Sequence, residues 1–221
     1  ERHTGAAFVH YMGYGEMTET DPSGAAIGTF SPKDMVAGVG YSYLLSDRWA
    51  GGAAFKLLYS SIANYHTAAV AVDLGLNYYD ADRELSLSVV GKNLGGQLKA
   101  YDDNYEAMPI DVQIGVSKRL KHTPFRLSAT LVDLNHWHYS LMKHFVFGVD
   151  AQLSQNIWVG AGYSLRRANE MKVGDVDTAS SHGAGLSLGA GLQLERFKLN
   201  LAYGKYHVSS SSVVLNLSFS L

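Results

Sequence analysis

The stretch "HGAGLSLGAGLQLERF", residues 182–197, has an alternating pattern that decides the fold class of the chain. From Ala184 onwards every second residue is apolar, and the residues between them are small or polar and mostly glycine. A period of two is typical of an extended strand with one apolar face, because successive side chains of a strand point to opposite faces. We therefore predict one continuous strand here.

The same stretch contains the pattern G-x-S-x-G, "GLSLG" at 185–189, which occurs at the nucleophile of many serine hydrolases. That site needs a strand, a sharp turn and a helix, and the alternation continues through the place where the turn should be. No Asp follows Ser187, so Glu195 and His207 are the only candidate partners after it. We predict that Ser187 lies on the polar face of a strand, that the chain has no catalytic residue and that it is not an enzyme. A lipase built on Ser187 is the alternative.

Comparable alternation recurs in about a dozen segments, and no segment shows a helical period of 3.6. The composition agrees, with 23 Gly and 14 Tyr but only 4 Pro among 221 residues. The polar faces carry mostly Gly, Ser, Asn and Gln, as expected of a crowded barrel interior, whereas a sandwich facing water should carry more Lys and Glu. The clearest segments lie at 35–45, 70–78, 110–116, 125–131, 145–153, 157–165 and 197–203.

The connections between these segments alternate in length. In an up-and-down meander every second connection lies at the same end of the strands, so one rim should carry tight turns and the other long loops, as in outer-membrane barrels. Strand-end aromatic residues would suit the aromatic girdles of such a barrel. The expected short turns are 46–48, 80–83, 121–123, 154–156 and 195–196, the expected long links are 61–66, 95–109, 135–143, 168–181 and 208–211, and the expected girdle residues are Tyr43, Trp49, Tyr59, Tyr78, Tyr79, Trp158, Tyr163, Tyr203 and Tyr206.

We predict an all-β fold, a transmembrane up-and-down antiparallel β-barrel with about 12 recognisable strands and 14 in the full protein. It would form a single domain over residues 1–221, with the N-terminal part of the barrel absent from this sequence. The final strand, "VLNLSFSL" at 214–221, favours a periplasmic C-terminus and therefore extracellular long loops. The net charge of −2 is scattered along the chain, which argues against a nucleic-acid partner.

Two motifs could hold a metal ion. In "NHWHYSLMKH", His136, His138 and His144 lie close together, but no carboxylate completes the set. In "YDDNYE", four residues could approach a calcium ion, namely Asp102, Asp103, Asn104 and Glu106, but the central glycine of a calcium loop is missing. We therefore predict neither a metal nor a cofactor, and interpret both motifs as rim segments.

The same two segments combine aromatic and polar residues, which is the usual composition of a protein interface. We predict that they bind a folded protein partner. The candidate residues are Tyr101, Asp102, Asp103, Tyr105 and Met108 in the first segment, and His136, Trp137 and His138 in the second.

Three longer phrases resemble the PorQ proteins of the type IX secretion system of Bacteroidota: "GTFSPKDM" at 28–35, "KLLYSSIANYHTAAVAVDLGLNYY" at 56–79 and "GKNLGGQLKAYDDNYEAMPIDVQIGVSKRL" at 91–120. The resemblance implies an outer-membrane barrel similar to the long-chain fatty acid transporter fold. It also implies a non-enzymatic anchor of the surface attachment complex, embedded in membrane lipid, with a PorZ-like surface protein as direct partner and the PorU sortase and PorV barrel in the same complex. The alternative function is uptake of hydrophobic small molecules.

Overall fold

The structure is a computed structural model that describes residues 2–101, 104–136, 138, 140–171, 183–207 and 209–219. Within these residues the chain is all-β, as predicted, with only one α-helix and one 3-10 helix. No helix among the described residues is long and apolar enough to span a membrane. The strands are β1 (His3–Gly13), β2 (Met17–Thr20), β3 (Ala26–Phe30), β4 (Lys33–Leu44), β5 (Trp49–Ile62), β6 (Tyr65–Asp80), β7 (Leu85–Lys99), β8 (Asp111–Arg119), β9 (Phe125–Leu131), β10 (Phe145–Gln152), β11 (Ile157–Ser164), β12 (Leu186–Gln193), β13 (Phe197–Gly204) and β14 (Ser212–Phe219), and the helices are η1 (Leu141–His144) and α1 (Leu165–Glu170).

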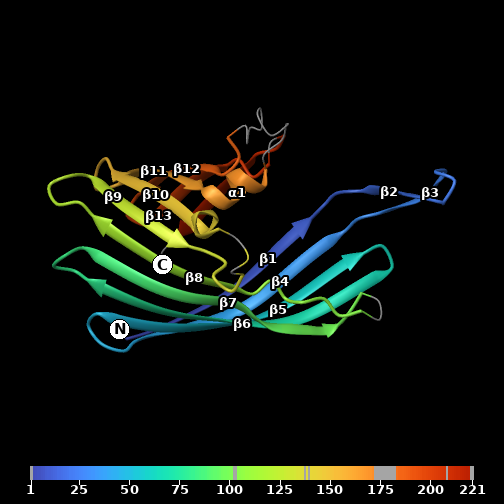
Figure 1. The fold of residues 1–221 in the computed structure, drawn as a ribbon, viewed down its shortest axis with the longest axis horizontal. Coiled ribbons are helices and arrows are strands. Elements are labelled where there is room, and N and C mark those ends of the chain that lie inside the picture. Colours follow the sequence, from blue (N-terminus) through green and yellow to red (C-terminus); the bar gives the residue numbers. More distant parts are fainter. Residues whose placement is uncertain are drawn as a thin grey trace. The chain divides into compact units, whose positions relative to one another are not determined.

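The sheet has the up-and-down order that the connections predicted. A 12-stranded sheet has the order β1-β4-β5-β6-β7-β8-β9-β10-β11-β12-β13-β14, so its strands are neighbours in the order in which they occur along the chain. The strands β2 and β3 form a separate antiparallel hairpin between β1 and β4, which the sequence pattern did not predict. Figure 1 shows this hairpin beyond the ends of β1 and β4.

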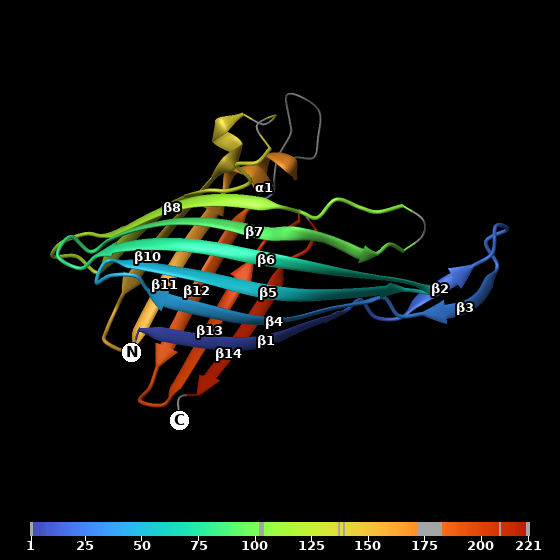
Figure 2. The ribbon, with the colours of Figure 1, turned by 90° about the horizontal axis from the view of Figure 1, so that it is seen from below.

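The chain divides into two compact units. Unit 1 contains residues 1–77 and 90–112, and unit 2 contains residues 78–89 and 113–221. Within unit 1, β1, β4 and β5 pair along their lengths, and Figure 2 shows them side by side. Within unit 2, β8 to β14 pair in succession, and α1 packs against η1 and β10.

The register places apolar and polar residues on opposite faces, as the alternation predicted. Leu188 of β12 pairs with Ala161 on one side and Tyr203 on the other, whereas the adjacent Ser187 pairs with Gly162 and Gly204. Paired residues of antiparallel strands point to the same face, so each unit-2 strand contributes to one apolar and one polar face. Ser187 lies inside β12, which confirms the strand interpretation.

All five short turns are present, but three sequence-based predictions are wrong in detail. The link expected at 61–66 is a two-residue turn at 63–64, because β5 and β6 are longer than the alternation indicated. The strand expected to reach Leu165 ends at Ser164, whose hydroxyl accepts a hydrogen bond from the backbone NH of Arg167 and caps α1. Trp158 is not a girdle residue, because its register partners are Gln152 and Gly191 on the polar face.

Candidate partner-binding surface

The link between β7 and β8 in unit 1 carries the first group of predicted residues. Tyr105 is 67% exposed, which suits a contact residue, and Met108 is half-buried. Asp102 and Asp103 lie outside the described residues. Two hydrogen bonds hold the link against β7: Gln97 Oε1 accepts from the NH of Glu106 at 2.6 Å, and the side-chain amide of Asn93 donates to the carbonyl of Pro109 at 2.9 Å.

Tyr101 has a structural role in the same unit. Its hydroxyl donates to Ser60 Oγ, and the Ser60 hydroxyl in turn donates to Asp34 Oδ1. The other oxygen of Asp34 accepts a hydrogen bond from the hydroxyl of Tyr14 at 2.5 Å. Because deprotonation would remove this bond and place a second negative charge beside Asp34, the pKa of Tyr14 is raised above its usual value. Tyr101 therefore ties its link to β4 and β5, a role that the spacing of residues in the sequence did not reveal.

A half-buried cluster of polar side chains from β5, β6 and β7 is connected to this link. Lys56 Nζ is 2.7 Å from Asp73 Oδ1 and donates to Asn93 Oδ1 at 2.5 Å, and the NH of Asn93 donates to Asp73 Oδ1 at 2.8 Å. Asn93 has a φ of +56°, a left-handed conformation that asparagine tolerates better than most residues. Through its bond to Pro109, Asn93 connects the strand interior to the link.

The link between β9 and β10 in unit 2 carries the second group. Asp133, only 6% exposed, accepts hydrogen bonds from His136 Nδ1 at 2.6 Å and from Arg166 Nη1. Arg166 Nε also donates to Glu170 Oε1 at 2.8 Å. The pKa of Arg166 is raised, mainly by this bond and in part by Asp133. His138 is exposed, and Trp137 lies outside the described residues.

The histidines of this link have separate surroundings. His144 is 1% exposed, and its Nδ1 lies 2.7 Å from the carbonyl oxygen of Val132, whereas His136 contacts Asp133. Among the residues that the structure describes, no three His, Asp or Glu side chains are close enough to share a metal ion. His144 is instead a buried residue of η1, which packs against α1.

The two predicted groups belong to different units, so the structure describes two separate segments. In unit 1, Tyr105 offers an exposed aromatic side chain on a link held by hydrogen bonds. In unit 2, His136 and His138 lie on a link that Asp133 and Arg166 fix to α1. The sequence could not reveal the role of Asp133, because its partner Arg166 is 33 residues away, directly after a segment predicted to be a strand.

The polar face of unit 2 has a hollow of about 300 Å³. Its floor includes Gly160, Gly162 and Gly189, and it is also lined by Trp158 and Tyr206. A Cβ at Gly191 would lie 2.0 Å from Trp158 Nε1, so the indole lies directly against β12. The paired glycines of β11 and β12 are therefore crowded strand positions.

The comparisons with known proteins define the fold. No family model and no curated protein matches the chain. Among solved structures, the crystal structure of the toluene transporter TodX of Pseudomonas putida is similar, with a TM-score of 0.51, 12% identity, and coverage of 90% of this chain and 72% of that chain. Together with the up-and-down sheet, this similarity shows that the chain has an outer-membrane β-barrel fold.

Proposed function

We propose that this protein is a non-enzymatic barrel of the bacterial outer membrane that holds a folded protein at the cell surface through its long links. The observation that carries the proposal is the difference between the two ends of the strands. In unit 2 one end has only short turns, whereas the other has the links at 132–144, 165–185 and 205–211. Short turns offer too little surface for specific binding, so the long links are the candidate contact region.

The finer proposal concerns the partner. The sequence resemblance to PorQ proteins supports a role in the attachment complex of the type IX secretion system. The direct partner would then be a PorZ-like surface protein, with the PorU sortase and the PorV barrel in the same complex. The long links would face outwards and the C-terminus would face the periplasm.

The contact residues follow from exposure and hydrogen bonding. The side chain of Tyr105 takes part in neither of the two hydrogen bonds that hold the link against β7, so a partner can bury it without breaking them. Aromatic side chains often dominate the binding energy at the centre of interfaces. Tyr101 contributes indirectly, because its hydroxyl holds the link to Ser60. The link is thereby preorganised, which lowers the entropy cost of binding.

The test is co-purification of a PorZ-like partner from native membranes with Tyr105→Ala combined with Trp137→Ala. We expect the barrel to remain in the membrane while the partner is released into the medium. The matched control is Tyr79→Ala, which removes an exposed tyrosine next to the short turn at 81–84 and should retain the partner. Full retention of the partner by the double variant would contradict the proposal.

The alternative function, uptake of small apolar molecules, is favoured by the similarity to a toluene transporter and by the hollow of about 300 Å³ on the polar face of unit 2. Ala202 lines this hollow, so Ala202→Phe should fill it. If the protein is a transporter, this variant should lose uptake of a labelled apolar solute, and the double variant above should not. If it is an anchor, the double variant should release the partner, whereas Ala202→Phe should retain it.

A further inference from the structure

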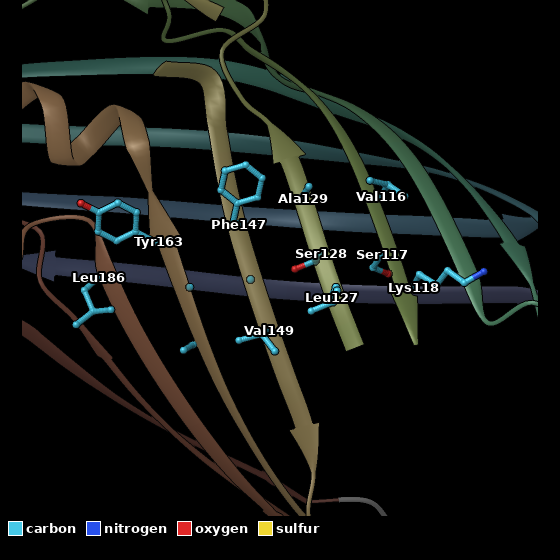
Figure 3. A pocket seen from close by; sticks show the side chains of 13 residues that line it. Val116, Ser117, Lys118, Leu127, Ser128, Ala129, Phe147, Val149, Tyr163 and Leu186 are labelled. Atoms are coloured by element: carbon cyan, nitrogen blue, oxygen red, sulfur yellow. The ribbon is translucent and has the colours of Figure 1, made fainter. Parts of the chain in front are cut away.

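The apolar face of unit 2 has a groove of about 630 Å³ across β8 to β12. Figure 3 shows the side chains around it, with the rings of Phe147 and Tyr163 at one end and Leu127 and Val149 towards the other. The volume lies within the range of about 300–1,000 Å³ that is usual for ligand sites.

The register explains why the groove is hollow. Leu127 pairs with Val149, and Phe147 pairs with Tyr163, so these four large side chains share one face. Ala129 pairs with Phe147, and Ala161 pairs with Val149. Each small side chain therefore has a large neighbour on the adjacent strand, and the two alanines leave space between the larger groups.

One end of the groove is charged. Lys118 is the one charged side chain among the lining residues that the structure describes, and it is exposed. It pairs with Leu127 and therefore points to the apolar face, and it is one residue from the end of β8, beside the short turn at 120–124. A lysine at the edge of a membrane-facing surface places its ammonium group at the level of the lipid headgroups.

The arginines nearby point elsewhere. Arg119 and Arg126 pair with each other on the polar face, where Arg119 Nε lies 3.8 Å from Glu84 and Arg126 Nε lies 3.3 Å from Asp150. The positive charge on the apolar face at this position therefore comes from Lys118.

We infer that this groove binds an acyl chain of an anionic phospholipid, with the headgroup phosphate beside Lys118. The inference rests on the barrel fold and does not depend on the proposed partner. Inside a bilayer the hydrophobic effect does not favour one apolar surface over another, because lipid chains already surround the protein. Selectivity must therefore come from the shape of the groove and from the charge of Lys118.

Two substitutions separate these contributions. Lys118→Gln removes the charge and leaves the groove, whereas Ala161→Leu fills the groove and leaves the charge. The control for the charge is Lys198→Gln, because Lys198 pairs with Gln193 and Ser218 on the polar face. The control for the groove is Ala190→Leu, because Ala190 lies on the apolar face but does not line the groove.

The experiment is to reconstitute each protein in vesicles of three parts phosphatidylethanolamine and one part phosphatidylglycerol, extract it in mild detergent and quantify co-purifying lipids by native mass spectrometry. We expect the unaltered protein to be enriched in phosphatidylglycerol. Lys118→Gln should lower this enrichment roughly fivefold, the effect of about one membrane-proximal lysine. Ala161→Leu should lose most of the bound lipid, and both controls should behave like the unaltered protein.

The inference is overturned if Lys118→Gln keeps the enrichment, or if either control loses lipid to the same extent as its partner variant. It is also overturned if palmitate added to the vesicles displaces phosphatidylglycerol, because a free fatty acid would then be the ligand. Folding of each variant is checked by the shift in mobility between heated and unheated samples on a gel.

Discussion

Gly95 in β7 shows how a single residue limits strand packing. A Cβ at this position would lie 2.0 Å from the carbonyl oxygen of Val70 and 2.7 Å from the Cα of Ala71. These are backbone atoms that cannot rotate away, so we expect Gly95→Ala to destabilise the protein by about 1–3 kcal/mol. Gly96→Ala is the matched control, because no atom lies within 4 Å of its Cβ position. Urea unfolding in detergent measures both, and equal midpoints would refute the close contact.

A substitution at Leu188 tests which face of β12 contacts lipid. An arginine on the lipid face of a barrel costs about 2–4 kcal/mol near the bilayer midplane and about 0–1 kcal/mol near the interface. We therefore expect Leu188→Arg to lower the free energy of unfolding in lipid vesicles by much more than Leu194→Arg, since Leu194 lies in the short turn after β12. Similar losses for the two variants would be inconsistent with a membrane-spanning β12.

The alternation of residues predicted the face of a side chain better than its residue type did. Ser187 could be placed on the polar face, because alternation over several residues fixes the side on which each residue lies. The residue type of Trp158 favours a girdle, whereas its position between Ile157 and Val159 places it on the polar face. The sequence could not show that it covers Gly191, because that contact depends on the register between two strands.

At the scale of elements, the β2–β3 hairpin depends on the turn around Asp21. Its carboxylate accepts hydrogen bonds from the hydroxyl of Ser23 at 2.6 Å, from the NH of Ser23 at 2.8 Å and from the NH of Ala25 at 3.0 Å. These bonds, that of the Ser23 hydroxyl first, lower the pKa of Asp21. A carboxyl whose pKa is lower in the folded state stabilises the turn above its unfolded pKa, and this contribution is lost as the pH falls through the folded value.

We therefore expect the hairpin to loosen in acid before the sheet does. An NMR titration of the protein in micelles should show Asp21 titrating below an ordinary aspartate, and Ser23→Ala should move its pKa back towards the usual value. If Asp21 titrates normally and Ser23→Ala has no effect, the hydrogen bonds do not hold the turn.

Helix α1 depends on Arg166, which donates to both Asp133 and Glu170. Arg166→Gln should leave Asp133 poorly compensated and loosen the link at 132–144. A charge-assisted hydrogen bond contributes about 1.5–3 kcal/mol, so hydrogen exchange in this link should accelerate roughly tenfold or more. Arg196→Gln, in the turn at 194–196, serves as the control and should leave that exchange unchanged. Unchanged exchange in both variants would show that the cluster does not hold the link.

The elements missed in the sequence share a physical reason. Helix α1 has six residues and the strands of the hairpin have four and five, too few for a period to stand out. The hairpin did carry a turn signal, "DPSG" at 21–24, which favours a tight turn because Pro fixes φ and Gly permits a positive φ. Gly24 has a φ of +86°. Long strands, by contrast, repeat their alternation often enough to be recognised.

At the scale of the whole molecule, the all-β fold and the order of strands could be predicted, because an up-and-down sheet needs only local alternation and short connections. The candidate surface could be predicted only in part. The sequence indicated which links are long, but the anchoring of Tyr101 by Ser60, 41 residues away, comes from packing between strands. Of the two tyrosines predicted in the first group, Tyr105 is exposed and Tyr101 is half-buried, so Tyr105 is the one more accessible to a partner.

The last prediction concerns the orientation of the barrel. Connections of an up-and-down barrel alternate between the two ends of its strands, so we expect the links at 100–110 and 165–185 to share one end and the turns at 81–84 and 153–156 to share the other. Outer-membrane barrels place long loops outside the cell and short turns in the periplasm. Epitope tags after Asn104 and Met171 should therefore bind antibody on intact cells, and tags after Ala81 and Gln155 should bind it only once the outer membrane is permeabilised.

All four tags should be detected in permeabilised cells, which controls for expression. Labelling of the short-turn tags on intact cells, with none of the long-link tags, would reverse the orientation and remove the physical basis for a partner bound at the cell surface.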